Sequence, residues 1–488
     1  MRPNSADEAD RRDAAEIRRH GGWAVVGRAL NAVTVLGLTA FLARVLGERD
    51  FADFNVLRTV LTLVGLAAAS GLGTAALRAT GEAVARDDTG AARRVAGNVV
   101  RLAIPIQLAV SLAAGVLVWR FGGLLFAGEA TPTIAACVAV ATLTMAALQV
   151  CAEILRGLGE PAAANLLGGL RGAPLLNSGL LLMIGAVALW SRATFTSAAI
   201  AYAATGLLLM GPAVWRVRQR VRTLPVEPAS DAAAERRAMW QVAWPVALTA
   251  LLTSAVTQLD QLIAPAAMGE AQSAAYVNAR RVVIFAMFPL SVLNTTAAGL
   301  IGRMYFGGRR VELQAALQAG AALIGLPCLV FYAVAFVAPQ VVVAVVLGPG
   351  YEACHEPLRW LVPGHLLITL TGSCGLALLL TGWQRAALVI NGIGLAALLV
   401  GGPLAGRWGG SVAMAGFVSV HLGAASIAAW FVARRKAGLD TRARLTLLAR
   451  PRKLKAALRP GHGASAPMPP SPNAQSPNAQ SPNTQTPS

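Results

Sequence analysis

Long apolar runs alternate with short polar segments along most of the 488-residue chain. A helix needs about 20 apolar residues to cross the hydrocarbon core of a bilayer. The pattern therefore predicts an all-α polytopic membrane protein with twelve transmembrane helices. Their approximate ranges are 22–44, 53–78, 97–119, 131–155, 162–189, 194–215, 240–264, 275–301, 313–338, 357–381, 386–405 and 410–433.

The chain repeats itself after about 222 residues. Aligning Gly47 with Gly269 brings L-G-E-R-D-F-A-D-F-N-V-L-R beside M-G-E-A-Q-S-A-A-Y-V-N-A-R, with Arg58 opposite Arg280. Internal similarity at a fixed offset indicates duplicated architecture. This period is too long for a solenoid, so we predict two related lobes of six helices each.

Polar segments divide the chain into five parts. These are an N-terminal tail (1–21), an N-lobe (22–215), a linker (216–238), a C-lobe (239–435) and a C-terminal tail (436–488) that is first basic and then disordered. The end of that tail carries tandem S-P-N-A-Q repeats, which cannot bury enough apolar area to become ordered. Lys and Arg concentrate in the tails and in alternate loops, which predicts that both termini are cytoplasmic.

Composition changes this picture little. The chain is 56% hydrophobic and only 13% charged, too little charge for a soluble surface. Its net charge of +19 comes from basic residues in short loops and tails, so we expect no nucleic acid partner. The five scattered cysteines lack metal-like spacing. We also find no phosphate loop, nucleophile elbow or zinc motif, and so expect no metal, no cofactor and no enzymatic activity.

Charges inside the predicted helices are the main candidates for function. An arginine near a helix centre costs about 2.5–3.5 kcal/mol on insertion scales, and such residues usually face a cavity. Cations at several depths suit an anionic head group that must cross, with snorkelling to an interface as the alternative. Arg58 and Arg280 occupy repeat-related positions, and each lies ~9 Å inside the external end of its predicted helix. The candidates are Arg28, Arg58, Arg171, Arg280 and Arg281.

The predicted helix 240–264 carries a polar stripe. It consists of Ser254, Thr257, Gln258 and Gln261, at i, i+3, i+4 and i+7. Such a stripe either lines a wet cavity or bonds to neighbouring helices. We take Gln258 and Asp260 as substrate-binding candidates and expect Asp260 to pair with Arg280 or Arg281 while the site is empty. His365 and His421 stand among apolar residues, which favours packed histidines over a proton relay.

Six motifs, in order over about residues 20–435, resemble those of the polysaccharide and O-antigen flippases. This family belongs to the superfamily that also contains the lipid II flippase and the multidrug and toxin extruders. The motifs are A-R-V-L-G-E-R-D-F-A-D-F-N, G-L-G-T-A-A-L-R, R-G-L-G-E-P, Q-L-D-Q-L-I-A, Y-V-N-A-R-R and L-G-P-G-Y-E.

The resemblance implies two six-helix lobes around a V-shaped central cavity. It also implies a polyprenyl diphosphate substrate that carries an oligosaccharide, with the diphosphate held by cavity arginines on helices 1, 2 and 8. The matching positions are Arg28, Arg58 and either Arg280 or Arg281. The lipid II flippase has fourteen helices, and its extra pair forms a groove for the lipid tail. The predicted twelve helices leave no such pair here, which argues against lipid II as the substrate.

We therefore expect a flippase of the bacterial inner membrane that acts in surface polysaccharide biosynthesis by alternating access. Its expected partners are the lipid-linked glycan, membrane lipids and other polysaccharide-assembly proteins. An ion-coupled multidrug exporter of the same superfamily is the first alternative, disfavoured because the deep charges are mostly basic. A membrane-embedded glycan polymerase or ligase is the second, disfavoured because the longest external loop has only about 18 residues.

Overall fold

The computed structural model describes residues 30–85 apart from residue 32, residues 88–126, 131–168, 174–226 and 232–444, and residue 446. Every regular element within these ranges is a helix. The predicted tail 1–21, Arg28, Arg171 and the C-terminal repeats lie outside the described residues.

The first half of the chain forms a helix over Val33–Leu46 and then α2 (Glu48–Ala69), α3 (Leu72–Ala85), α4 (Thr89–Phe121), η1 (Gly122–Leu124), α5 (Pro132–Gly157), α6 (Pro161–Leu167), α7 (Pro174–Trp190) and α8 (Phe195–Arg222). The second half forms α9 (Ala232–Gln258), α10 (Asp260–Ala267), α11 (Glu270–Phe285), α12 (Phe288–Phe306), α13 (Arg310–Val337), α14 (Pro339–Val346), η2 (Glu352–Cys354), α15 (His355–Thr371), α16 (Cys374–Leu380), α17 (Gln384–Val432) and η3 (Ala433–Ala437).

These helices confirm the all-α membrane class. By length and composition, seven helices of the described residues are able to cross a membrane, or eight if the bent pair Glu352–Thr371 and Cys374–Leu380 is one span. Some of the other predicted spans are built from two consecutive helices, such as α6 with α7 and α11 with α12, and the last two predicted spans lie in the single long element α17. The count of twelve spans stays a prediction.

Helix ends differ from the hydropathy prediction in an informative way. The helix predicted over 53–78 breaks at Ser70 and Gly71, whose φ angles are 50° and 65°. In contrast, α8 continues to Arg222 and α9 begins at Ala232, so the region predicted as a linker is mostly helical where it is described. Arginine is a good helix former, and hydropathy reports which part of a helix is apolar rather than where the helix ends.

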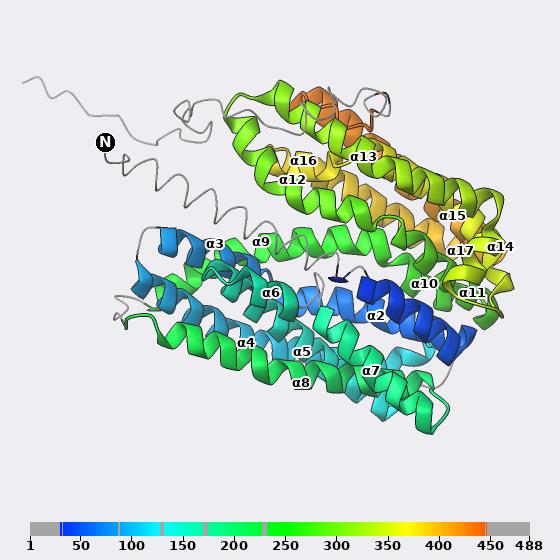
Figure 1. Cartoon of the computed structure of the whole chain (residues 1–488), viewed down its shortest axis with the longest axis horizontal. Helices are drawn as coiled ribbons and strands as arrows, with labels where there is room; N and C mark the ends of the chain where they lie inside the picture. Colours follow the sequence, from blue (N-terminus) through cyan, green and yellow to red (C-terminus); the bar gives the residue numbers. More distant parts are fainter. Residues whose placement is uncertain are drawn as a thin grey trace, which may run out of the picture.

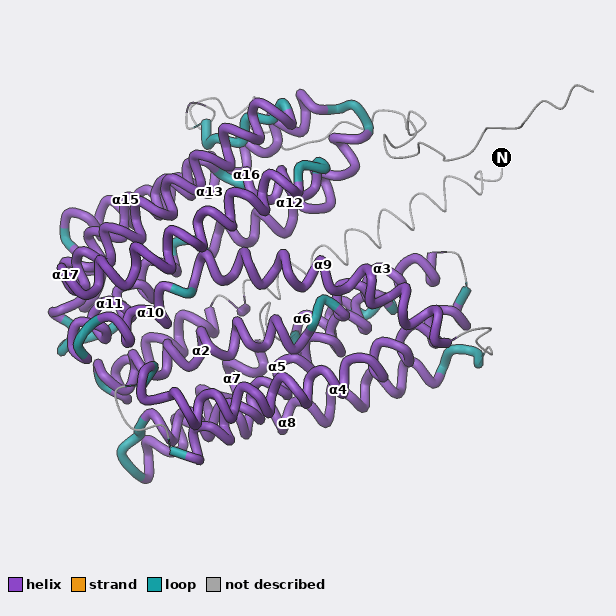
Figure 2. The backbone as a smooth tube through the Cα atoms, turned by 180° about the vertical axis from the view of Figure 1, so that it is seen from behind, coloured by secondary structure: helices purple, strands orange, loops and turns teal. Residues whose placement is uncertain are grey.

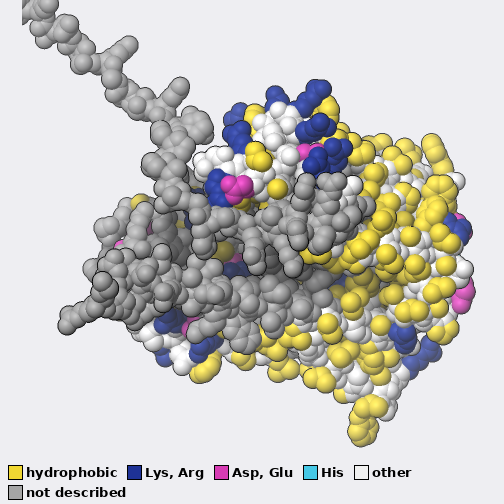
Figure 3. Space-filling model, turned by 45° about the horizontal axis from the view of Figure 1, so that its top comes forward, with side chains coloured by type: hydrophobic (Ala, Val, Ile, Leu, Met, Phe, Trp, Pro, Cys, Tyr) yellow, Lys and Arg dark blue, Asp and Glu magenta, His cyan; other side chains and the backbone are white. Residues whose placement is uncertain are grey.

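The two halves form two bundles that meet at one end and diverge toward the other (Figures 1 and 2). We call the end with α2, α10, α11 and α14 the joined end, and the end with α3, α12 and α16 the divergent end. Helix α9 runs between the bundles and packs against α2 and α3 on one side and α17 on the other. In the space-filling view, hydrophobic side chains cover much of the described surface, as expected for lipid-facing helices (Figure 3).

Apart from those made by α9, contacts between the halves lie at the joined end. Helices α2 and α11 begin after the repeat-related glycines Gly47 and Gly269 and pack against each other. The Asn55 side chain donates a hydrogen bond to Asn278 Oδ1 at 3.3 Å. Nearby, the Tyr351 hydroxyl donates to the Ala43 carbonyl at 2.6 Å. The internal repeat thus forms the structural joint between the halves.

Candidate substrate site between the two halves

Arg58 and Arg280 lie at matching places in two matching helices. Each follows its N-cap glycine by the same number of residues, and α2 and α11 begin at Glu48 and Glu270. At 1.5 Å per residue, each arginine is ~15 Å from the first residue of its helix. The sequence predicted a distance of only ~9 Å from the helix end to each arginine. The distance is longer because the first turn of each helix is polar, and hydropathy does not count it as part of the helix.

The Arg280 guanidinium is fully paired inside the second half. It is 2% exposed, and its Nε donates to Asp260 Oδ2 at 2.8 Å. One terminal nitrogen donates to the Thr257 carbonyl at 2.8 Å, and the other lies 2.6 Å from His365 Nε2. The Tyr276 hydroxyl donates to the same Asp260 oxygen at 2.5 Å. Arg280 therefore ties α11 to the end of α9, to α10 and to α15.

The geometry fixes the state of His365 in this network. An arginine can only donate hydrogen bonds, so the His365 nitrogen that faces Arg280 must be an unprotonated acceptor. The other ring nitrogen lies 2.8 Å from the Leu361 carbonyl and must be the donor. His365 is thus a neutral, fully packed histidine, as the sequence favoured. One oxygen of Asp260, Oδ1, is buried and has no hydrogen-bond partner among the described residues.

Arg281 faces a different neighbour from Arg280, because successive helical residues point about 100° apart. It is half-buried, and its Nε is buried without a hydrogen-bond partner in the described part of the chain. Its guanidinium lies 5.5 Å from the centre of the Phe285 ring. Because α2 and α11 pack against each other, it lies within electrostatic range of Arg58 of α2, and like charges repel.

Arg58 is also half-buried, and no hydrogen bond or ion pair of its side chain occurs within the described residues. The phenol of Tyr202, from α8, lies within electrostatic range of both Arg58 and Arg281. Two cations from opposite halves thus approach each other with no described counter-ion. No sequence pattern pointed to Tyr202, because an aromatic residue in an apolar helix usually indicates packing.

The polar stripe ends beside these charges. Gln258 is the last residue of α9 and is partly buried, while Thr253 and Thr257 are exposed. The Thr257 hydroxyl bonds to the carbonyl of Thr253, and Asn391 of α17 donates to the Thr253 hydroxyl at 3.1 Å. Thr253, which flanks the stripe, therefore contacts a neighbouring helix, whereas Thr257 of the stripe lies on the exposed side of α9.

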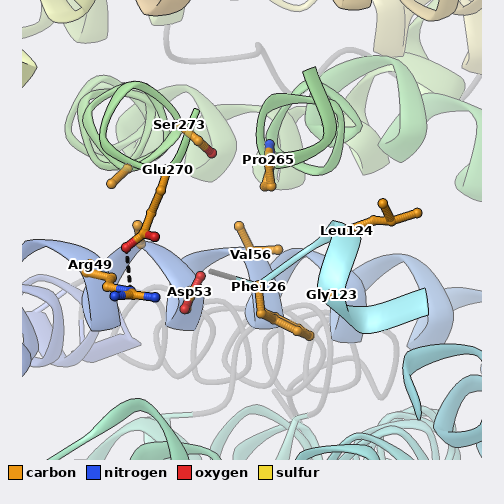
Figure 4. A pocket seen from close by; sticks show the side chains of 11 residues that line it. Arg49, Asp53, Val56, Gly123, Leu124, Phe126, Pro265, Glu270 and Ser273 are labelled. Carbon is orange, nitrogen blue, oxygen red and sulfur yellow. Dashed lines mark ion pairs between the residues drawn. The ribbon is translucent and has the colours of Figure 1, made fainter. Parts of the chain in front are cut away.

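A small pocket of about 170 Å³, lined by both charged and apolar side chains, lies at the joined end (Figure 4). Arg49 of α2 reaches across it to Glu270 of α11, with 2.5 Å between Arg49 Nε and Glu270 Oε1. Asp53 lies one turn further along α2, and Phe126 forms part of the wall. Among the residues that the structure describes, no group of three or more His, Cys, Asp or Glu side chains is arranged to hold a metal ion.

Comparison with known proteins identifies the fold. No protein-family model and no curated protein sequence matches the chain. Solved structures do match. An inward-facing multidrug resistance MATE family transporter of the MOP superfamily aligns with a TM-score of 0.67 and 16% identity, covering 84% of this chain and 94% of that chain. An outward-facing MATE family transporter of the MOP superfamily aligns with a TM-score of 0.60 and 18% identity, covering 87% of this chain and 95% of that chain.

A further solved structure is a MOP superfamily transporter from Pyrococcus furiosus, described as having a binding pocket of reversed polarity that suggests a different function. It aligns with a TM-score of 0.53 and 18% identity over 87% of this chain and 94% of that chain. At these identities the comparisons show the fold. The chain has the fold of the MATE transporters of the MOP superfamily, and its fold resembles the inward-facing structure more closely than the outward-facing one.

Proposed function

We propose that this protein is a flippase that moves a polyprenyl-diphosphate-linked oligosaccharide across the bacterial inner membrane by alternating access, for surface polysaccharide such as O-antigen, capsule or exopolysaccharide. The observation that carries this proposal is the pair of uncompensated arginines, Arg58 and Arg281. Two cations that repel each other inside a membrane protein are costly unless an anion binds between them.

A diphosphate fits this pair in charge and chemistry. It carries about two negative charges, and guanidinium groups form strong, bidentate hydrogen bonds with phosphate oxygens. Because Arg58 comes from the first half and Arg281 from the second, an anion held by both would stabilise the approach of the halves. Differential binding of this kind is what allows a ligand to shift a conformational equilibrium. The phenol of Tyr202 is a further donor to a phosphate oxygen.

Arg280 has a different role in this proposal. It neutralises Asp260 and holds α9, α10 and α15 together, so it supports the site without contacting substrate. The sequence alignment paired Arg58 with Arg280, but Arg281 is the residue whose charge remains available. We therefore assign the diphosphate to Arg58 and Arg281, with exposed hydroxyl groups of α9 available to the sugars.

Transport can be measured in liposomes that contain the purified protein and a polyprenyl diphosphate with a labelled sugar. The fraction of sugar that a membrane-impermeant reagent reaches reports translocation. We expect Arg58→Ala and Arg281→Ala each to lower the initial rate at least about tenfold, because each removes a charged hydrogen-bond donor. Arg101→Ala, which changes an exposed arginine of α4, is the matched control. Rates equal to the control in both variants would refute the roles of these arginines.

An ion-coupled multidrug exporter is the second candidate, supported by the solved MATE transporters of the same fold. A cavity for cationic drugs needs accessible acidic groups. The buried carboxylates of Glu153 and Asp260 are instead paired with Arg156 and Arg280. Efflux of a lipophilic cationic dye from the same liposomes, without movement of the lipid-linked sugar, would favour this candidate.

A further inference from the structure

A larger pocket lies at the divergent end, where α9 packs against α3 and α4. Its volume is about 460 Å³, within the range of small-molecule sites. Each of the three helices turns one face toward it. On α3, for example, Ala75, Arg78 and Ala79 follow the i, i+3, i+4 spacing of a single helical face. The pocket therefore joins a helix of the second half to two helices of the first.

Counting only the described residues, the polar groups of this pocket leave one positive charge uncompensated. Arg94 Nε lies 3.6 Å from Glu235 Oε1, and Asn98 donates to Glu235 Oε2 at 2.8 Å. These contacts neutralise Glu235. Arg78 is exposed and forms no hydrogen bond or ion pair with any part of the chain that the structure describes. The site as a whole thus favours an anion.

The remaining walls are apolar. They include Ala75, Ala79, Val95, Met239 and Val242. An inorganic anion gains nothing from such walls, whereas a lipid with an anionic head can place its phosphate on Arg78 and its first apolar carbons against them. Burial of those carbons would add to the binding free energy at about 25 cal/mol per Å² of apolar surface. The combination of one free cation with apolar walls selects an amphiphilic anion.

The motif G-L-G-T-A-A-L-R explains how this pocket forms. Gly71 has a φ of 65°, and a Cβ at this position would lie 2.2 Å from the Ala243 carbonyl oxygen. Glycine therefore permits both the break after α2 and the close approach of α9. Arg78, the last residue of the motif, follows two turns later on α3. One short motif thus both allows the close packing of α9 and supplies the positive charge of Arg78.

We propose that this pocket is a loading site for the substrate, where the diphosphate and the first isoprene units of the lipid bind before the head group reaches Arg58 and Arg281. This inference rests on the proposed function, because it takes the substrate class from it. The pocket is distinct from the site between the halves: none of its lining residues contributes to that site.

The test uses the full-length purified protein and farnesyl diphosphate, a soluble C15 prenyl diphosphate, with bound molecules counted by native mass spectrometry. We expect two bound molecules in the wild type, one in Arg58→Ala/Arg281→Ala and one in Arg78→Ala. In the Arg58→Ala/Arg281→Ala background, adding Arg78→Ala should weaken the remaining binding about ten- to a hundredfold, as expected for the loss of a charged donor to phosphate. Arg78→Lys should restore much of it, and Arg101→Ala should retain both molecules.

A second variant tests the pocket without changing its charge. Ala79→Trp fills the apolar wall and should also remove one bound molecule. Farnesol, which lacks the phosphates, should not bind at the pocket in any variant.

The outcomes separate this inference from the proposed function. No binding by the wild type would overturn both. Two bound molecules in Arg78→Ala and in Ala79→Trp would overturn the loading site alone. Displacement of the molecule retained by Arg58→Ala/Arg281→Ala by an equal concentration of phosphatidylglycerol would mean that the pocket holds bulk membrane lipid, which would overturn the assignment of its occupant.

Discussion

Arg280 and Arg281 are neighbours in sequence, yet their removal should change stability in very different ways. The perturbation is Arg280→Met or Arg281→Met, since methionine keeps an unbranched apolar side chain and removes the charge. Arg280 makes three short contacts in a nearly solvent-free site, at 2.8 Å, 2.6 Å and 2.8 Å. Arg281 lies beside one aromatic ring and is repelled by Arg58.

The expected magnitudes follow from these contacts. Removing one partner of a buried ion pair typically costs about 3–5 kcal/mol, because the other charge stays buried. After Arg280→Met, Asp260 would keep only the Tyr276 hydroxyl, with Oδ1 already unpartnered. Arg281→Met loses a cation–π contact of about 0.5–1 kcal/mol. It also relieves a repulsion, so we expect almost no net change.

In the assay, each detergent-solubilised variant is heated, and the fraction of protein that remains monodisperse is measured. Large membrane proteins often unfold irreversibly, so the order of the variants is the readout rather than an absolute midpoint. Arg280→Met should lose its fold several degrees before the wild type, and Arg281→Met should match the wild type or exceed it. The double variant Asp260→Asn/Arg280→Met should recover most of the loss, because no unpaired charge remains. Equal melting of Arg280→Met and Arg281→Met would refute the reasoning.

Two more predictions concern other parts of the molecule. In a background without the native cysteines, a bis-methanethiosulfonate reagent should cross-link Arg49→Cys/Glu270→Cys across the joined end and stop transport until a reductant is added; transport by the cross-linked variant would show that this joint need not open. At the end of the second half, burial raises the pKa of Asp440, but hydrogen bonds from Arg442 and Trp430 outweigh it and lower the pKa from 3.8 to about 2. A lowered pKa stabilises the docked segment fully above pH 3.8 and less as the pH falls toward 2. The protection factors of the amides of residues 438–444, which correct for the intrinsic pH dependence of exchange, should therefore fall over that interval in the wild type and stay constant in Asp440→Asn.

Sequence patterns predicted the helical class and the matching starts of α2 and α11 for clear physical reasons. Membrane helices must be apolar over their length, and duplication left Gly47 and Gly269 at the start of two helices that now pack together. The expected ion pair of Asp260 also forms, with Arg280.

Other features depend on three-dimensional packing and left no pattern in the chain. Periodicity cannot decide which of two adjacent arginines faces inward, because that depends on the rotation of α11 about its axis. The contact of His365 with Arg280 joins residues 85 positions apart. Helix breaks such as the one between Phe285 and Phe288 occur within continuous apolar runs, where hydropathy has no contrast to report.

The tight seat of α9 on Gly71 affects how this protein can be divided into fragments. By sequence α9 opens the second half, but its backbone is fitted against the first. Co-expressed fragments separated between α8 and α9 would have to rebuild that fit from two chains. Fragments separated at Leu259 would keep that fit within one chain, and would instead have to rebuild the contacts of α9 with α17 and with Arg280.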